Sequence, residues 1–195
     1  KQGVFNSESP DHTWKATSGK IEFPESKTWK DYVRDTRLEI TCGEAPYLVS
    51  RYDTVSGMPI DLTERIGLLD RKLRVVSENT ETTGEFLDWC QEAYKNTYDY
   101  EWQGDNLLLA REALLFTFLD YYRAKFGENP LLKSIQYIAY IISWNVWQMD
   151  GLKFCPPGEE PCESDIFNPS NLCLIRDWRK PRDKQKIYFK SLLKS

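Results

Sequence analysis

Residues 129–151, with the sequence NPLLKSIQYIAYIISWNVWQMDG, decide the fold class of this 195-residue chain. The segment opens with Asn129 as a helix cap and Pro130 at the first helical position. Gly151 is placed to end the helix. Apolar residues occupy nearly every face of a helical projection, which is typical of a helix that is buried on all sides. We therefore expect a central helix with the rest of the domain packed around it.

Three more long helices are expected before this segment. The first begins at Asp61, which forms a capping box with Glu64, and its apolar residues repeat at i, i+4, i+7 and i+11. The second covers about residues 84–98. The third covers residues 105–126, and Gly127 is placed to end it.

Strands are expected to be short. The stretches Lys20–Phe23 and Leu38–Thr41 are β-prone and flank a short helix around Trp29–Arg34. Near the end, residues 172–178 and 186–192 flank a polar turn and read as a hairpin. The predicted fold is α+β: a mainly helical bundle with about four main helices, small peripheral strands and a C-terminal hairpin.

The length fits a single domain. Residues 1–19 are polar and without periodicity, so we expect a linker or loose arm there and one mainly helical domain over 20–195. No apolar run approaches the ~20 residues that a membrane span needs. No signal peptide is visible, so a cytoplasmic location with no membrane partner is expected.

Three of the five cysteines, Cys155, Cys162 and Cys173, fall in one loop-rich stretch with spacings C-x6-C and C-x10-C. Zinc sites usually use closer pairs with histidine help. The only histidine, His12, is distant in sequence. We expect reduced thiols and no metal, although these three cysteines leave a metal site open.

Charge is unevenly distributed: the net charge of −4 divides into +6 over residues 176–195 and −10 over the rest. An acidic body disfavours broad DNA binding, whereas a basic tail suits local phosphate contacts. Candidate DNA contacts in the tail are Arg179, Lys180 and Arg182. The alternative is a solvated hairpin.

A second basic group lies off the apolar stripe of the first long helix and consists of Arg65, Arg71, Lys72 and Arg74. These residues are the best candidates for phosphate contacts within the acidic body. Interleaved acidic residues favour the alternative, in which intrahelical ion pairs form on a solvated face.

The loop at residues 101–106 could read bases, because Trp102 could stack on a base while Gln103 and Asn106 bind its edge. Helix capping by Asp105 is the simpler explanation of this polar loop. A buried polar network is expected from Arg111, Asn145 and Gln148, with Arg111 paired to a carboxylate, because its helical position projects it from an apolar stripe.

No nucleotide-loop, zinc-protease or serine-hydrolase motif is present, so the catalytic residues are unknown. A metal-dependent nuclease could use Glu39 with Glu44 or Asp53.

Four stretches carry a family resemblance: LEITCGEAPYLVSRYDTVSGMPI (38–60), ERIGLLDRKLRVVSENT (64–80), YEWQGDNLLLARE (100–112) and IISWNVWQMDGL (141–152). From about Ile21 onward, the chain resembles bacterial proteins labelled as the modification (M) subunit of restriction endonucleases, or as the C-terminal part of DNA methyltransferase-like proteins. This resemblance implies adenine-N6 methylation with S-adenosylmethionine.

The chain departs from that pattern. Asn168-Pro169-Ser170-Asn171 lacks the second proline and the aromatic residue of an NPPY-type motif, and no glycine-containing cofactor motif is visible. We expect no cofactor in this chain, and assign S-adenosylmethionine and Mg only to a possible parent enzyme. The resemblance then implies an accessory domain for DNA target recognition or assembly, with DNA and a methyltransferase or restriction subunit as partners. A metal-dependent nuclease domain or a protein-binding scaffold are the alternatives.

Overall fold

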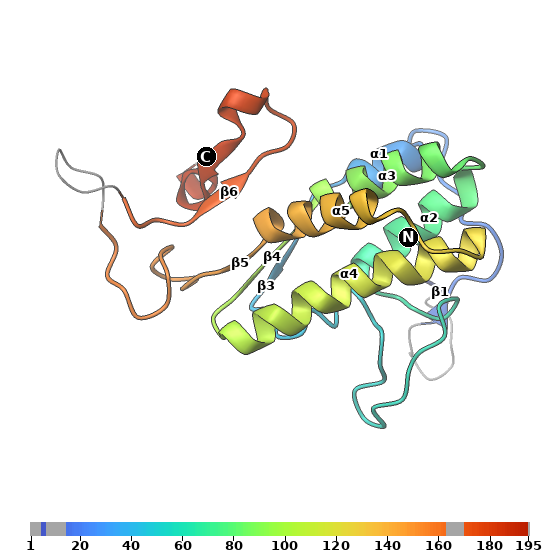
Figure 1. The fold of residues 1–195 in the computed structure, drawn as a ribbon, viewed down its shortest axis with the longest axis horizontal. Helices are drawn as coiled ribbons and strands as arrows, with labels where there is room; N and C mark the ends of the chain where they lie inside the picture. Colours follow the sequence, from blue (N-terminus) through green and yellow to red (C-terminus); the bar gives the residue numbers. More distant parts are fainter. Residues whose placement is uncertain (1–4, 7–14, 163–169, 195) are drawn as a thin grey trace.

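The computed structural model describes residues 5–6, 15–162 and 170–194 (Figure 1). His12, the pair Asn168–Pro169 and most of the expected N-terminal arm lie outside these residues. The elements follow in the order β1 (Phe5–Asn6), β2 (Lys15–Ala16), α1 (Trp29–Arg34), β3 (Arg37–Ile40), α2 (Leu68–Asn79), α3 (Thr83–Lys95), β4 (Thr97–Glu101), α4 (Gly104–Phe126), α5 (Leu132–Asn145), β5 (Val146–Gln148), β6 (Leu174–Arg176), η1 (Arg182–Lys184), β7 (Lys186–Tyr188) and η2 (Phe189–Lys194).

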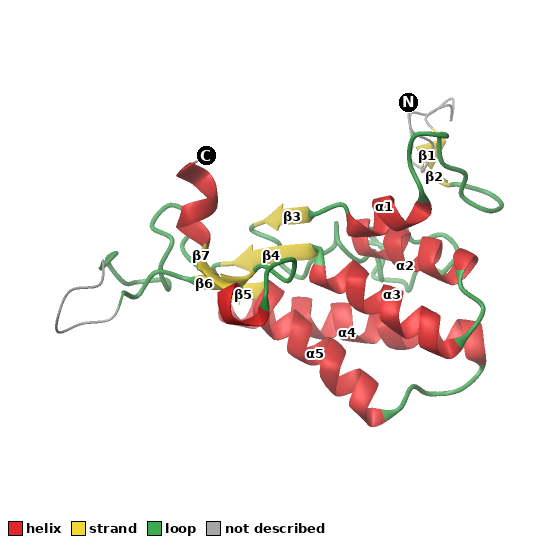
Figure 2. Ribbon diagram, turned by 90° about the horizontal axis from the view of Figure 1, so that it is seen from above, coloured by secondary structure: helices red, strands yellow, loops and turns green. Residues whose placement is uncertain are grey.

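The predicted fold class is confirmed. Long helices dominate, the strands are short, and β6 pairs antiparallel with β7 as the expected C-terminal hairpin. Figure 2 shows α2 to α5 lying side by side, with β3 to β7 gathered at one end of the bundle and β1 and β2 apart from them, near the N-terminus. No helix among the described residues is long and apolar enough to cross a membrane.

The helices enclose the main core, which includes fully buried Leu69, Phe86 and Phe118. A hydrogen bond of 2.7 Å from the Tyr94 hydroxyl to the Leu114 carbonyl links α3 to α4. A smaller second core, with Tyr100, Trp147, Met149, Ile175 and Phe189, lies between the strands and the hairpin.

The strands β3, β4 and β5 form one parallel sheet in that order. Thr97 lies opposite Arg37, and Asp99 lies opposite Val146. Parallel neighbours need long crossover connections, and here α2 with α3 and then α4 with α5 provide them. β3 is an edge strand, since β4 is its only strand partner within the described chain. The sequence did not reveal the parallel pairing, because the expected second and fourth helices ran into β4 and β5.

Several expected boundaries were wrong. The first long helix begins at Leu68 rather than Asp61, because the Asp61 carboxylate instead accepts hydrogen bonds from the Thr63 backbone and hydroxyl in a local turn. Lys20–Phe23 forms no strand. The helix expected to be central, α5, ends at Asn145, and Tyr140 on its outer face is 42% exposed.

Candidate functional site

The carboxyl ends of β3, β4 and β5 meet at one edge of the sheet, as the ends of parallel strands must. Glu39 lies opposite Asp99 in the register, and Glu101 follows Asp99 by two residues, so the three carboxyl side chains share one face. All three are buried, with exposed fractions of 9% for Glu39, 0% for Asp99 and 6% for Glu101. Buried carboxyl groups are costly unless paired, so this cluster needs a physical account.

Glu101 has its partners. Its Oε2 accepts a hydrogen bond of 2.7 Å from the Gly43 amide, and its Oε1 accepts one of 3.0 Å from the Gln103 amide. One carboxylate therefore ties the loop after β3 to the loop after β4. The loop after β3 is held in an unusual shape, because Thr41 and Ala45 adopt φ values of 54° and 61°, a region that side chains other than glycine rarely occupy.

Asp99 has no such partners. Neither of its carboxyl oxygens accepts a hydrogen bond, and the same holds for Oε2 of Glu39. Burial raises the pKa of Asp99 to about 7, and the charge of Glu101 adds to this effect. Burial, followed by the charge of Asp99, raises the pKa of Glu39 to about 7. Near neutral pH the two groups therefore titrate as a pair and are partly protonated.

The Cys42 thiol lies beside this pair. Burial raises its pKa well above the ordinary value, and the negative charge of Asp99 raises it further. Cys42 is therefore a thiol rather than a nucleophilic thiolate at neutral pH.

An open hollow of about 520 Å³ borders the cluster. It is lined by Glu39, Ile40, Thr41, Cys42, Gly43, Glu44, Pro46, Tyr47 and Thr54. Gly43 has φ 55°, and the space where a Cβ would stand holds no atom within 4 Å. A ligand can therefore approach the backbone at this residue.

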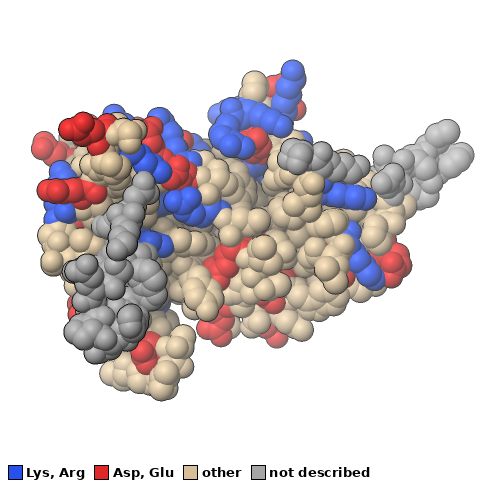
Figure 3. Space-filling model, turned by 180° about the vertical axis from the view of Figure 1, so that it is seen from behind, with Lys and Arg blue, Asp and Glu red and all other residues tan. Residues whose placement is uncertain are grey.

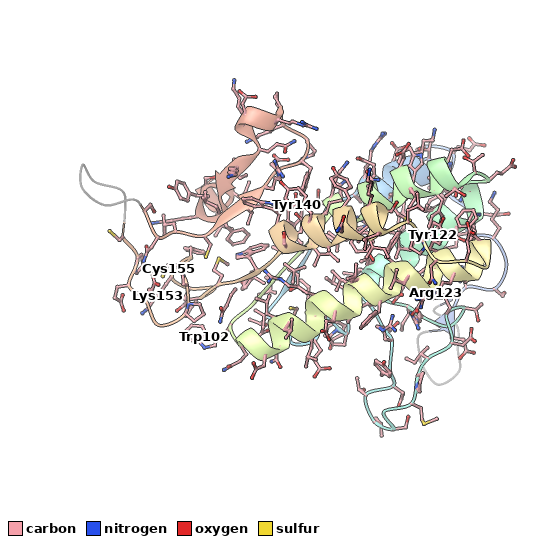
Figure 4. All side chains as sticks on the ribbon, viewed as in Figure 1. Trp102, Tyr122, Arg123, Tyr140, Lys153 and Cys155 are labelled. Atoms are coloured by element: carbon pink, nitrogen blue, oxygen red, sulfur yellow. The ribbon has the colours of Figure 1, made fainter. Side chains whose placement is uncertain are left out.

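The base-reading candidates lie at the same edge. Trp102 is 43% exposed at the start of α4 (Figure 4). Its carbonyl accepts a hydrogen bond of 2.9 Å from the Gln148 side chain, which joins the loop after β4 to the end of β5. Gln103 is exposed, and Asn106 is half-buried.

The candidate phosphate contacts near the first long helix are engaged within the fold rather than presented freely to solvent. Lys72 is 1% exposed, and its ammonium donates to the carbonyls of Asp35 and Asn96 over 2.6 and 3.0 Å. Arg65 is buried and forms an ion pair of 2.8 Å with Asp120. Internal acceptors therefore hold both cationic groups inside the fold, away from a phosphate at the surface.

The other two residues of that patch are also engaged. Arg74 pairs with Glu78 over 2.8 Å and donates to the Gly19 carbonyl over 2.6 Å. Arg71 is half-buried, which lowers the pKa of its guanidinium, and its Nε donates to the Gly67 carbonyl over 3.4 Å.

The expected buried network is only partly present. Asn145 is 1% exposed, and its side-chain amide donates to the carbonyls of Tyr94 and Thr97. Arg111 is half-buried, and it donates to the Val146 carbonyl over 3.0 and 2.7 Å instead of pairing with a carboxylate. The prediction was wrong for Gln148, whose side chain is exposed.

The hairpin carries the basic surface that the first helix lacks. Figure 3 shows Lys and Arg side chains gathered at the top of the molecule, where the C-terminal hairpin lies. Arg179 pairs with Asp177 over 2.9 Å, and Lys180 lies 4.0 Å from the same carboxylate. Arg182, Lys184 and Lys186 are exposed. None of these three forms an ion pair with another described residue.

Among the described residues, no group of three or more His, Cys, Asp or Glu side chains is placed to hold a metal ion. Of the three clustered cysteines, Cys155 is buried, Cys162 exposed and Cys173 half-buried. Asp53, considered for a nuclease site, accepts hydrogen bonds from the amides of Val55 and Ser56 in its own turn.

Sequence reasoning missed Asp99, Glu101 and Cys42. A signal was present in the strand TYDYE (97–101), where Asp99 and Glu101 alternate with two tyrosines. Alternation with a period of two indicates a strand with one polar face. The apolar pattern before this segment instead predicts the end of a helix followed by a capping loop.

No family model matches the chain, and neither a curated protein nor a solved structure matches it.

Proposed function

We propose that this chain is a ligand-binding module of a bacterial restriction–modification protein, and that the carboxyl edge of β3, β4 and β5 binds the nucleoside part of a small molecule. Ligands of open parallel sheets bind outside the carboxyl ends of the strands, and in dinucleotide-binding folds an acidic residue accepts a hydrogen bond from the ribose 2′-hydroxyl. The observation that carries the proposal is Glu101, which ends β4 and holds the Gly43 amide of the neighbouring loop.

The roles of the residues follow from their contacts. Glu101 is the candidate acceptor for sugar hydroxyls, because an ionised carboxylate has about four acceptor sites and the Gly43 and Gln103 amides take one on each oxygen. Gly43 lets the ligand come close to the loop backbone, because nothing occupies the space over its Cα. Trp102, exposed one residue after Glu101, offers a ring on which a base can stack.

The sequence alone argued against S-adenosylmethionine, because the glycine pattern of the cofactor motif is missing. That expectation stays a prediction. The parallel sheet supports a nucleoside ligand of some kind, and S-adenosylmethionine is the one that the family resemblance implies. Any methyl transfer would need catalytic residues that cannot be carried over to this chain from the resemblance.

Calorimetric titration with adenosine, S-adenosylmethionine and uridine tests the proposal. We expect one-to-one binding of at least one nucleoside. Glu101→Gln should weaken binding roughly tenfold or more, because hydrogen bonds to charged groups contribute about 1.5–3 kcal/mol. Glu112→Gln, at an exposed position of α4, is the matched control.

Since Glu101 also joins two loops, the melting temperature of the variant is measured alongside. Loss of affinity in a variant that melts like the parent supports the proposal. Binding of a nucleoside but not of S-adenosylmethionine supports the site and upholds the sequence-based expectation. If no nucleoside binds the parent chain, the proposal fails and the scaffold alternative takes its place.

The exposed charge of the hairpin favours a second role in DNA contact. Arg182, Lys184 and Lys186 are exposed on a segment of +6 net charge within an otherwise acidic chain. Such contacts position a protein on DNA without reading its sequence. In this proposal the domain helps a methyltransferase or restriction subunit of the same system to engage its target.

A further inference from the structure

The outer face of α5 carries a line of aromatic side chains. Tyr137, Tyr140 and Trp144 are spaced by three and four residues, so they follow one another along one side of the helix. The rings of Tyr137 and Tyr140 stack with centroids 6.2 Å apart and an interplanar angle of 25°. Tyr137 is 38% exposed and Tyr140 is 42% exposed. We call these three residues the aromatic stripe.

The hairpin places cations among these rings. The Arg176 guanidinium lies 5.4 Å from the ring centroids of both Tyr140 and Trp144, and 4.6 Å from that of Trp178. Its Nε is buried without a hydrogen-bonding partner. The Lys186 ammonium lies 5.1 Å from the Trp144 ring. Figure 4 shows Tyr140 on the side of α5 that meets the hairpin.

The charge of this face is positive. Helix α5 contains Lys133 and no acidic residue. The hairpin adds the exposed Arg182, Lys184 and Lys186 against one exposed acid, Asp183, while Asp177 is already paired with Arg179. Exposed aromatic rings can stack on flat apolar groups, and the neighbouring cations can bind negative charges. This face therefore suits a negatively charged polymer that also carries flat apolar groups.

We propose that the aromatic stripe and the hairpin bind an unpaired nucleic-acid strand, with bases stacked on Tyr137 and Tyr140 and phosphates held by Lys184 and Lys186. Proteins that bind single strands combine aromatic platforms with a cationic track in this way. A duplex hides the faces of its bases, so it can use the lysines but not the rings. This inference rests on the DNA contact proposed above, and it narrows that contact to a single strand and a surface.

Fluorescence anisotropy with labelled oligothymidine, its duplex with oligodeoxyadenosine, and oligouridine tests the inference. We expect the single strand to bind more tightly than the duplex. Tyr137→Ala should weaken single-strand binding about fivefold to a hundredfold, the range expected for the loss of one stacked base. Tyr137→Phe, which keeps the ring, should bind like the parent.

Tyr52→Ala is the control, because Tyr52 is 55% exposed in the loop between β3 and α2. If duplex and single strand bind equally and Tyr137→Ala changes neither affinity, the proposed role of the aromatic stripe is wrong. The proposed phosphate contacts of the hairpin would still hold. Binding of oligouridine alone would support the stripe and overturn DNA as the partner. If no nucleic acid binds at low salt, both this inference and the proposed DNA contact fail, whereas nucleoside binding at the sheet edge is tested separately by calorimetry.

Discussion

The indole Nε1 of Trp178 donates a hydrogen bond of 2.7 Å to Oδ1 of Asn145, and this contact fastens the C-terminal hairpin to the centre of the domain. The Asn145 amide nitrogen donates over 2.8 Å to the Tyr94 carbonyl and over 3.0 Å to the Thr97 carbonyl. One buried side chain therefore joins the end of α5 to α3, β4 and the hairpin.

Replacing Asn145 should be costly. Asn145→Ala leaves buried polar groups without partners, each at a cost of about 1–3 kcal/mol, so we expect a loss of roughly 2–4 kcal/mol. Trp178→Phe removes one hydrogen bond and should cost about 1 kcal/mol. Urea unfolding measures both. Ser143→Ala, at an exposed position of the same helix, should change stability by less than about 0.5 kcal/mol.

The loss of stability on replacing Arg111 distinguishes a buried ion pair from a contact with a backbone carbonyl. Breaking a buried ion pair would cost about 3–5 kcal/mol. Because Arg111 is half-buried and binds the Val146 carbonyl, we expect Arg111→Met to cost only about 1.5–3 kcal/mol in the same unfolding experiment. A loss near 5 kcal/mol would point to a carboxylate partner after all.

Gly67 and Gly84 differ in the space available for a side chain at their Cα atoms. A Cβ on Gly67 would stand 2.3 Å from the Leu48 carbonyl oxygen, whereas one on Gly84 would meet nothing within 4 Å. Gly67→Ala should therefore destabilise the fold by about 1–3 kcal/mol or more. Gly84→Ala, within α3, should be neutral or stabilise it by up to about 1 kcal/mol. Similar melting temperatures for the two variants would contradict the close packing of Gly67 on Leu48.

These predictions separate what the sequence could reveal from what it could not. The helical pattern found the bundle, because stripes such as Leu69, Leu73 and Val76 persist over several turns. It missed β4 and β5, because each has at most five residues and follows directly or closely on the apolar pattern of a helix. Parallel pairing leaves no local turn signal, since the paired residues are far apart in the sequence.

The candidate site was harder to predict for the same reason. The sequence indicates Glu39 as a candidate, but its neighbour Asp99 lies 60 positions later and comes beside it only through the register of β3 and β4. The sequence pattern predicts an exposed charge for Lys72, because a long side chain off the apolar stripe normally reaches solvent. Here the carbonyls of Asp35 and Asn96 hold it inside.

The carboxyl pair should leave a signature in the pH dependence of stability. Burial raises the pKa of Glu39 and Asp99 to about 7, from ordinary values of 4.5 and 3.8. Between the ordinary pKa values and about 7, the folded state binds more protons than the unfolded state. The free energy of unfolding that these two groups contribute therefore falls as the pH rises toward and through about 7. We expect Asp99→Asn to gain stability relative to the parent between about pH 5 and pH 8.

Urea unfolding across that range checks this prediction, and comparison of the variant with the parent cancels the titrating groups that do not interact with Asp99. Lys72 affects the free energy of unfolding at higher pH. Burial lowers its pKa to about 7, so the free energy of unfolding rises as the pH increases from about 7 toward 10.5. If the difference between Asp99→Asn and the parent is the same at every pH, then Asp99 is not buried as a partly protonated group.

The salt dependence of DNA affinity should change when basic residues of the hairpin are replaced, and not when those of the first long helix are replaced. Each phosphate contact contributes about 0.9 to the slope of log affinity against log salt. The double variant Lys184→Ala/Lys186→Ala should therefore flatten this slope by up to about 1.8 for a duplex and up to about 1.4 for a single strand. Arg74→Ala should leave the slope unchanged, because Arg74 is bound to Glu78 and to the Gly19 carbonyl.

The edge position of β3 has a consequence for how the domain behaves among other chains. Leu38 and Ile40 are 42% and 61% exposed there, while the charge of Glu39 is turned inward. Within the described chain, one edge of β3 has no strand partner; a free edge with apolar side chains is a template onto which another strand can add, and proteins usually protect such an edge with charge or a covering segment. A strand that pairs with β3 would enlarge the sheet beyond three strands. Without such a cover, concentrated copies of this domain will tend to aggregate edge to edge.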